Sequence, residues 1–337
     1  MEQTKSFLKV HDLCVEYSSN LETVKAVNRV SFSLEKGKTL GLVGETGAGK
    51  TSIARAILGI LPDPPAKIPC GEIFFEGEDL LKASQAQMRR IRGAKISMIF
   101  QDPMTALNPV LTVGSQISEA IRQHKGISKQ EAEREGRRML ELVGIPAERY
   151  GEYPHQFSGG MKQRVVIAIA LACDPELLIA DEPTTALDVT IQAQVLELIR
   201  NLQQEHQMAM ILITHDFGIV AETCDEIAVV YAGQIVEYGT IEQVFAKKLH
   251  PYTQGLFGSI PKLTGSVERL HSIEGMPPDP TKLPQGCFFS PRCRYAEDCC
   301  RAPGEIPLRD MGDGHFCRCL KAERLTEKGA DRNAAAD

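Results

Sequence analysis

The residues best suited to chemistry form one segment, Gly44-Glu45-Thr46-Gly47-Ala48-Gly49-Lys50-Thr51, followed by Ser52. It fits the pattern GxxxxGK[ST], in which backbone N–H groups wrap around phosphate oxygens at a helix N-terminus. The Lys50 ammonium adds a charge for the β- and γ-phosphates, and the Thr51 hydroxyl can ligate Mg²⁺. We therefore expect residues 44–52 to bind a nucleoside triphosphate.

Two carboxylates follow a later apolar run. Residues 177–180 read LLIA, and Asp181 and Glu182 come directly after them. In open α/β sheets, ligands bind where the strands end, so both acids are expected beside the phosphates. Asp181 would hold Mg²⁺, directly or through water, and Glu182 would polarise an attacking water as general base.

Alternating strand and helix patterns must position these residues. Residues 7–43 indicate short strands, the last of which is buried and ends at Gly44, and a helix is predicted over residues 50–58. Buried strands are expected at 96–100, 177–181 and 208–214, helices over 112–143, and a hairpin over 228–238. This order predicts an α/β fold with a largely parallel sheet.

Five further motifs occur in chain order: Tyr17; Gln101 in IFQDPMTALNP; Ser158-Gly159-Gly160 in FSGGM; Asp188 in ALD; and His215 in ITHDFG. Each is weak alone, but together with the phosphate loop they resemble the ATP-binding-cassette (ABC) family across residues 1–250. Met161 departs from the glutamine usual at that position of the family signature.

The resemblance implies a P-loop NTPase core with an antiparallel β subdomain and a helical signature subdomain at about residues 102–165. It implies that Tyr17 stacks on adenine, and that Gln101 and His215 join Glu182 in catalysis. The implied Mg²⁺ ligands are Thr51, Gln101 and Asp181. ATP and Mg²⁺ are the implied cofactors.

The turn Ser158-Gly159-Gly160 lies over 100 residues from Lys50 in the sequence and precedes a helix. The resemblance implies that this turn, with Asp188, faces the nucleotide of an opposite cassette. Helix N-termini attract anions, so the expected site is shared by two cassettes arranged head-to-tail. The implied partner is a second, homologous ATPase subunit in a heterodimer.

Composition changes after about residue 250, where Pro, Gly and Cys rise and periodicity fades. We expect a separate, loop-rich extension over 251–325 and a disordered tail over 326–337. Six of the ten cysteines lie between 287 and 319. Because residues 1–10 do not resemble a secretion signal, disulfides are a poor explanation for the cysteines, and a metal or cluster site is a better one.

The extension resembles that of dipeptide and oligopeptide importer ATPases, with nickel importers as near relatives. The resemblance implies a [4Fe–4S] cluster on Cys287, Cys293, Cys300 and Cys319, for which Cys299 or Cys317 could substitute. The spacing, with 5, 6 and 18 intervening residues, lacks the Cys-x₂-Cys pair usual for zinc. Zinc or free thiols remain alternatives.

Charge and hydropathy limit the partners. The net charge of −6 gives no basic footprint for nucleic acid, and the longest apolar run is about nine residues, from Val165 to Cys173. A spanning helix needs roughly 20 residues, so membrane subunits would be separate chains.

The resemblance implies an importer ATPase on the cytoplasmic face of the membrane. Two permease subunits would dock on about residues 102–125, and an extracytoplasmic binding protein would deliver peptide. A nickel or other small-solute importer is the near alternative. A soluble cassette ATPase acting on nucleic acid or ribosomes is the alternative of another class. The sequence shows neither the coiled-coil insertion nor the tandem cassettes of that class.

Overall fold

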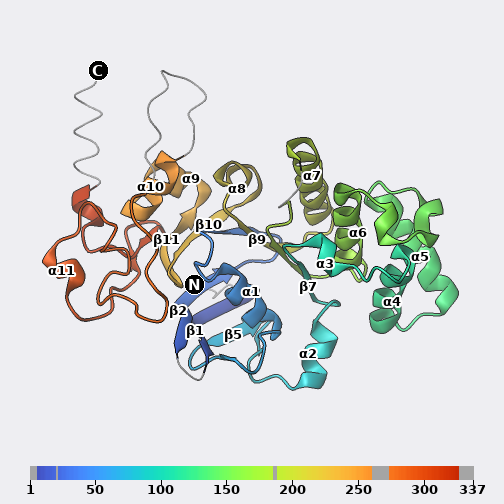
Figure 1. Ribbon diagram of the computed structural model, residues 1–337, viewed down its shortest axis with the longest axis horizontal. Helices are drawn as coiled ribbons and strands as arrows, with labels where there is room; N and C mark the ends of the chain where they lie inside the picture. The colour runs from blue at the N-terminus through green and yellow to red at the C-terminus, as the bar shows by residue number, and fades with distance from the viewer. Residues whose placement is uncertain (1–5, 20–21, 185–187, 260–272, 326–337) are drawn as a thin grey trace.

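The computed structural model describes residues 6–19, 22–184, 188–259 and 273–325. The expected tail at 326–337 lies outside these ranges. Figure 1 shows the sheets in the middle of the molecule, helices α4–α6 at one end, and the C-terminal extension, in orange and red, at the other. No helix among the described residues is long and apolar enough to cross a membrane.

The larger sheet contains eight strands in the order β12-β13-β11-β10-β3-β9-β8-β7. Five neighbouring strands are parallel: β10 (Glu226–Tyr231), β3 (Thr39–Val43), β9 (Ala209–Thr214), β8 (Leu177–Asp181) and β7 (Ile96–Ile99). Nearly all their residues are buried, as expected for parallel strands covered on both faces. The predicted α/β fold with a largely parallel sheet is confirmed.

A second, antiparallel sheet covers the first helix. It contains β1 (Leu8–Ser18), β2 (Thr23–Leu34), β4 (Ala66–Lys67), β5 (Glu72–Phe75) and β6 (Glu78–Asp79). Helix α1 (Lys50–Leu58) contacts β1 and β2 as well as β8. Because α1 lies between the two sheets, one apolar core holds both of them.

The helical end is built from α3 (Pro103–Ala106), α4 (Val113–Lys125), α5 (Lys129–Leu142), two short 3₁₀ segments (Ala147–Gly151 and Pro154–Gln156) and α6 (Gly159–Leu171). Thr112 and Ser128 cap α4 and α5 with their hydroxyls, and Gly126 ends α4 in the left-handed conformation. These local signals divide the predicted helical region 112–143 into two helices. Helices α2 (Gln85–Ile91), α7 (Val189–Glu205) and α8 (Phe217–Thr223) complete the cassette.

The extension is joined to the core rather than separate. After β11 (Gln234–Thr240), α9 (Ile241–Ala246) and α10 (Pro251–Gly258), the chain forms α11 (Asp298–Arg301), β12 (Arg309–Asp310) and β13 (Phe316–Cys317). Strand β13 pairs antiparallel with β11, placing Cys317 opposite Glu237. This pairing attaches the expected extension to the main sheet, and the sequence did not indicate it, because two-residue strands leave no periodic pattern.

Glu237 is the polar anchor of this join. Its carboxylate is fully buried and accepts hydrogen bonds from the backbone N–H groups of Leu249 and His250, both at 2.8 Å. The His315 Nε2 lies 3.0 Å from Glu237 Oε1. One carboxylate of β11 therefore satisfies groups on two other segments, and buried polar groups are stable only when they are satisfied in this way.

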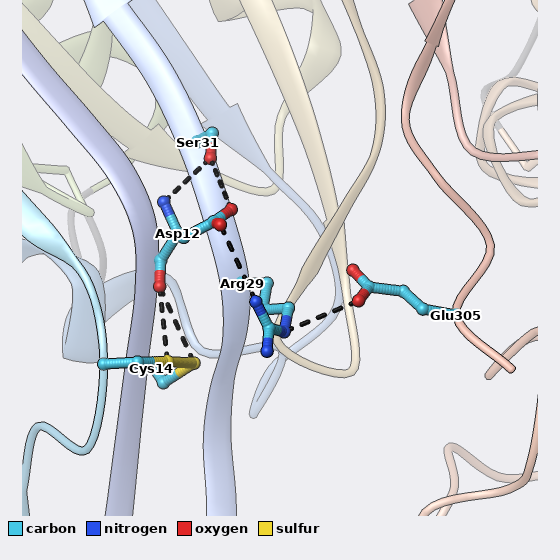
Figure 2. The surroundings of a disulfide bond; sticks show 6 residues. Asp12, Cys14, Arg29, Ser31 and Glu305 are labelled. Carbon is cyan, nitrogen blue, oxygen red and sulfur yellow. Dashed lines mark hydrogen bonds and ion pairs between the residues drawn. A yellow bond between two sulfur atoms is a disulfide. The ribbon is translucent and has the colours of Figure 1, made fainter.

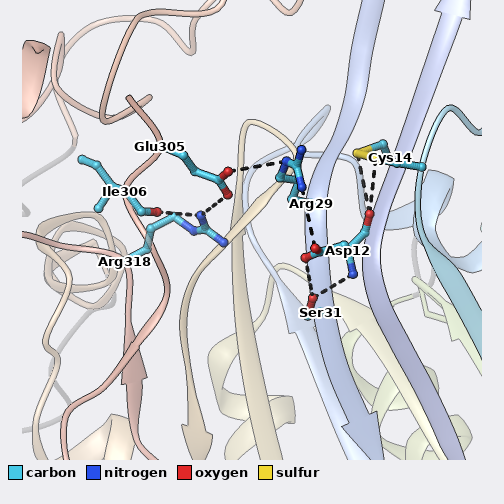
Figure 3. A network of polar contacts seen from close by, with 8 residues as sticks. Asp12, Cys14, Arg29, Ser31, Glu305, Ile306 and Arg318 are labelled. Carbon is cyan, nitrogen blue, oxygen red and sulfur yellow. Dashed lines mark hydrogen bonds and ion pairs between the residues drawn. A yellow bond between two sulfur atoms is a disulfide. The ribbon is translucent and has the colours of Figure 1, made fainter. Parts of the chain in front are cut away.

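Ionic contacts also connect the extension to the antiparallel sheet (Figure 3). Arg29 of β2 lies 3.6 Å from Asp12 and 3.5 Å from Glu305. Glu305 lies 3.4 Å from Arg318, which is buried and also donates to the backbone oxygens of Ile235 and Ile306. Burial lowers the pKa of Arg318. The network joins both sheets and the extension.

Two cysteines of the antiparallel sheet form a disulfide, Cys14–Cys70, with their Cα atoms 5.3 Å apart. Figure 2 shows the Asp12 carbonyl directed toward the sulfurs. The expectation that disulfides do not explain the cysteines is therefore wrong for this pair. The two residues are 56 positions apart. Only the pairing of β1 with the segment before β5 brings them together.

We expect Glu237→Ala to lower the free energy of unfolding by about 3 kcal/mol, because His315 and two buried N–H groups lose their acceptor. Urea unfolding measures this. Glu78→Ala, at an exposed position of β6, serves as the control and should change stability by less than about 0.5 kcal/mol. Equal stability of the two variants would contradict the anchoring role.

Candidate functional site

Four adjacent parallel strands bring the predicted site residues to one edge of the sheet. Their order is β3-β9-β8-β7, and their pairing places Val43 opposite Thr214, Asp181 opposite Ile213, and Ile99 opposite Ala180. The phosphate loop, His215, the two acids and Gln101 each follow one of these strand ends. Chain segments up to 170 residues apart thus meet where α/β folds bind ligands.

The phosphate loop is held open by its lysine and its glycines. Lys50 Nζ donates to the backbone oxygens of Gly44 at 2.7 Å and Glu45 at 3.0 Å. Gly49, which precedes α1, has φ 101°, and a Cβ there would lie 2.3 Å from the Ala26 oxygen. Burial lowers the pKa of Lys50. The ammonium is thus fixed at the start of α1, where an anion is favoured.

Asp181 and Thr51 supply two adjacent oxygen atoms. Asp181 is 2% exposed, and burial raises the pKa of its carboxyl group above its usual range. The Thr51 hydroxyl lies close enough to that carboxylate to oppose the rise in its pKa. Hard divalent cations prefer oxygen ligands of this kind, so the donor set fits Mg²⁺.

Glu182 brings the other candidate catalytic residues together. The Gln101 amide Nε2 donates to Glu182 Oε2 at 3.0 Å, and His215 Nδ1 lies 3.6 Å from Glu182 Oε1. The His215 side chain is 72% exposed, whereas that of Glu182 is 14% exposed. Glu182 has φ 45°, a strained conformation that positions it just after β8.

Tyr17 lies at the edge of the site. Its hydroxyl is 3.0 Å from Ser52 Oγ at the start of α1, and its ring packs against the core. The pairing of β1 with β2 places Tyr17 opposite Val24. The aromatic ring is therefore beside the helix that carries the phosphate loop.

The Ser158-Gly159-Gly160 turn does not join this cluster in one chain. Ser158 caps α6, and Figure 1 shows α6 apart from α1. A Cβ at Gly160 would lie 2.5 Å from Ile191 Cγ2, so α6 and α7 approach too closely for any larger residue. Asp188 caps α7 by accepting from the Ile191 N–H at 3.0 Å. Residues 186 and 187 lie outside the described ranges.

Residues beyond the cassette also reach the phosphate loop. Arg292 donates to both Glu45 carboxylate oxygens, at 2.9 and 3.1 Å, and the Glu45 N–H donates to the Tyr252 hydroxyl at 3.0 Å. Sequence reasoning assigned neither Arg292 nor Tyr252 to this site. No sequence signal could have found the pairing, because 247 positions separate Arg292 from Glu45.

The four expected cluster cysteines line one cavity of about 20 Å³: Cys287, Cys293, Cys300 and Cys319. Burial raises the pKa of Cys287 to about 11 and also raises that of Cys293 and Cys319. Cys299 is exposed, and Cys317 is buried under β11. Among the described residues, no three Cys, His, Asp or Glu side chains are grouped as ligands of a metal ion.

The fold and the loop at its sheet edge define this chain as an ATPase of the P-loop class. The ABC transporter family model matches residues 27–185, and the oligopeptide/dipeptide transporter C-terminal region matches residues 236–300. The chain belongs to the ABC transporter family and carries that C-terminal region.

Curated relatives align over nearly the whole chain. The dipeptide transport ATP-binding protein DppD of Bacillus subtilis is 54% identical, over 98% of this chain and 99% of the relative. The oligopeptide transport ATP-binding protein OppD of Bacillus subtilis is 49% identical, over 94% and 89%. The Escherichia coli DppD is 47% identical, over 93% and 96%.

Solved structures confirm the fold. The ATP-binding cassette MJ0796, in a dimeric post-hydrolysis state bound to ADP and Pi, superposes with a TM-score of 0.63 at 24% identity, covering 69% of this chain and 98% of that one. CbiO1 from Clostridium perfringens, part of the ABC transporter complex cbiONQ, gives 0.62 at 28% identity, covering 72% and 92%.

We expect Asp181→Asn to raise the melting temperature of the ligand-free chain at pH 8. Burial raises the pKa of Asp181 in the folded state above its value in the unfolded state, which is near 4. The contribution of Asp181 to stability is therefore fully present below the unfolded-state pKa. That contribution is lost as the pH rises through the folded-state pKa. Asparagine cannot ionise, so the difference in melting temperature between the variant and the unaltered chain should vanish near pH 4. The rise in melting temperature caused by MgATP should also disappear, because the ligand oxygen has lost its charge.

Differential scanning fluorimetry at both pH values, with and without MgATP, measures these effects. The control is Asp313→Asn, at an exposed position of the extension. A lower ligand-free melting temperature for Asp181→Asn at pH 8 would show that the ionised carboxylate stabilises the fold instead.

Proposed function

We propose that this chain binds and hydrolyses ATP to energise an importer of dipeptides or oligopeptides. One observation carries the proposal: Lys50, Thr51, Asp181 and Glu182 meet at one sheet edge, in a chain that aligns end to end with peptide transport ATP-binding proteins. Import of nickel or another small solute is the alternative, because an ATPase subunit does not contact the cargo.

The geometry supports a role for each residue in hydrolysis. Lys50 and the loop N–H groups grip the phosphates, and Tyr17 stacks on the adenine. Thr51, Asp181 and Gln101 would hold Mg²⁺, which when bound would neutralise charge on the phosphates. Glu182 accepts a proton from the attacking water, while Gln101 and His215, both beside its carboxylate, orient that water.

The separation of α6 from α1 supports a shared site. Ser158 caps α6, and Figure 1 shows this helix apart from α1, which begins at Lys50. We assign the Ser158-Gly159-Gly160 turn, with Asp188, to the nucleotide of a second, homologous cassette arranged head-to-tail. ATP then bridges the two subunits, and its hydrolysis releases the pair. A heterodimer is the proposed assembly.

An exposed apolar surface supports docking of the permeases. Phe100, Val110 and Leu111 lie beside Gln101 or shortly after it, and Val110 is 75% exposed. Exposed apolar residues in one region are typical of interaction surfaces. We assign this surface to two transmembrane permease subunits at the cytoplasmic face, with an extracytoplasmic binding protein delivering peptide.

The gathering of four thiols supports a [4Fe–4S] cluster. Four cysteine thiolates are the usual ligands of such a cluster, and the extension resembles that of peptide-importer ATPases. Four thiolates could also bind one zinc ion, which is the alternative. Cys287, Cys293, Cys300 and Cys319 are the proposed ligands, and the cluster would staple a segment with little regular structure.

The transport proposal is tested by purifying the chain with its co-encoded permeases and measuring phosphate release. Binding protein loaded with a dipeptide or oligopeptide should stimulate turnover, and Glu182→Gln should lower it at least about hundredfold, because the general base is lost. Glu222→Gln, at an exposed position of α8, is the control. Stimulation by nickel-loaded binding protein alone would support the alternative.

The cluster proposal is tested by anaerobic purification. We expect brown protein containing about four iron and four sulfide per chain. Cys300→Ser should lose the iron, whereas Cys299→Ser, at an exposed position, should keep it. One zinc per chain would support the zinc alternative, and colourless, metal-free protein would reject both.

A further inference from the structure

The contact between the extension and the phosphate loop converges on one residue, Glu45. Its backbone oxygen accepts from Lys50, its N–H donates to Tyr252, and its carboxylate accepts both hydrogen bonds of the Arg292 guanidinium. The N–H group, the backbone oxygen and the carboxylate of Glu45 therefore all help to hold the phosphate loop in place. Two of these three contacts come from residues beyond position 250.

Arg292 is itself rigidly held. Its side chain is only 6% exposed and donates to the backbone oxygen of Glu274 at 3.1 Å. The guanidinium carbon lies 5.7 Å from the Tyr231 ring centroid and 6.0 Å from that of Phe289. A bidentate arginine with this much packing fixes the direction of its carboxylate partner.

Charge makes the pair important for an anionic ligand. Burial lowers the pKa of Lys50, and the Glu45 carboxylate is one of three nearby acids whose charge opposes that shift. Without Arg292, an uncompensated negative charge would lie beside the triphosphate. Repulsion between like charges in a partly buried site is strong, because solvent screens it poorly.

We propose that Arg292 is a positioning residue for ATP, which holds Glu45 and neutralises it so that the phosphate loop accepts a triphosphate. The C-terminal extension thereby becomes part of the nucleotide site. This inference rests on the ATP-binding function proposed above. It assigns Arg292 no contact with the nucleotide.

The test measures the affinity of MgATP and the steady-state KM and kcat for five variants and the unaltered chain. Arg292→Gln should weaken binding about tenfold, mostly in KM, because Glu45 is left unpaired. Arg292→Lys should restore most of the affinity, because the positive charge returns. Glu45→Gln/Arg292→Gln should bind MgATP within about threefold of Glu45→Gln alone, because both charges are gone.

The double variant separates charge compensation from folding, since a merely structural loss would persist or deepen in it. Arg294→Gln is the matched control: it removes an exposed arginine from the same loop, two residues away.

Unchanged affinity in Arg292→Gln, or a double variant that binds more weakly than either single one, would overturn the proposal. Failure of the unaltered chain to bind MgATP would instead overturn the nucleotide site itself. The two failures are therefore distinguishable.

Discussion

Two opposite charges, the Lys50 ammonium and the Asp181 carboxylate, are withdrawn from water at the same edge of the parallel sheet. Burial disfavours the charged form of each, so the ligand-free site carries an electrostatic cost that phosphate and Mg²⁺ can offset. The surrounding structure maintains this arrangement. Parallel strands fix the spacing of the two groups, and the backbone oxygens of Gly44 and Glu45 hold the lysine ammonium.

The parallel sheet also explains how distant segments of the chain contribute residues to the site. Glu182, Gln101 and His215 follow three neighbouring strands, so pairing register alone brings their side chains within 3.0 to 3.6 Å. The Ser158 turn follows no strand of this edge, and its helix lies elsewhere. One chain therefore presents the phosphate loop and, apart from it, the Ser158 turn, which we propose faces the nucleotide of a second cassette.

The extension contacts both the main sheet and the phosphate loop. Strand β13 extends the sheet beyond β11, the buried Glu237 joins three segments, and Arg292 reaches back to Glu45. The loop that carries Arg292 also carries Cys287 and Cys293, which line the cysteine cavity. The arginine that contacts the phosphate loop and two of the cavity cysteines therefore lie on one short segment. A fixed conformation of this segment at one of the two sites supports a fixed conformation at the other.

The sequence by itself determined the elements whose cause is local. The glycines and Lys50 predict a phosphate loop, and the run before Asp181 predicts a buried strand, because each depends on neighbours within a few residues. Only the tertiary structure decided the Cys14–Cys70 pairing, the joining of β13 to β11, and the Arg292–Glu45 contact. These depend on which distant segments are packed side by side, and a single two-residue strand or lone arginine carries no periodic signal of its partner.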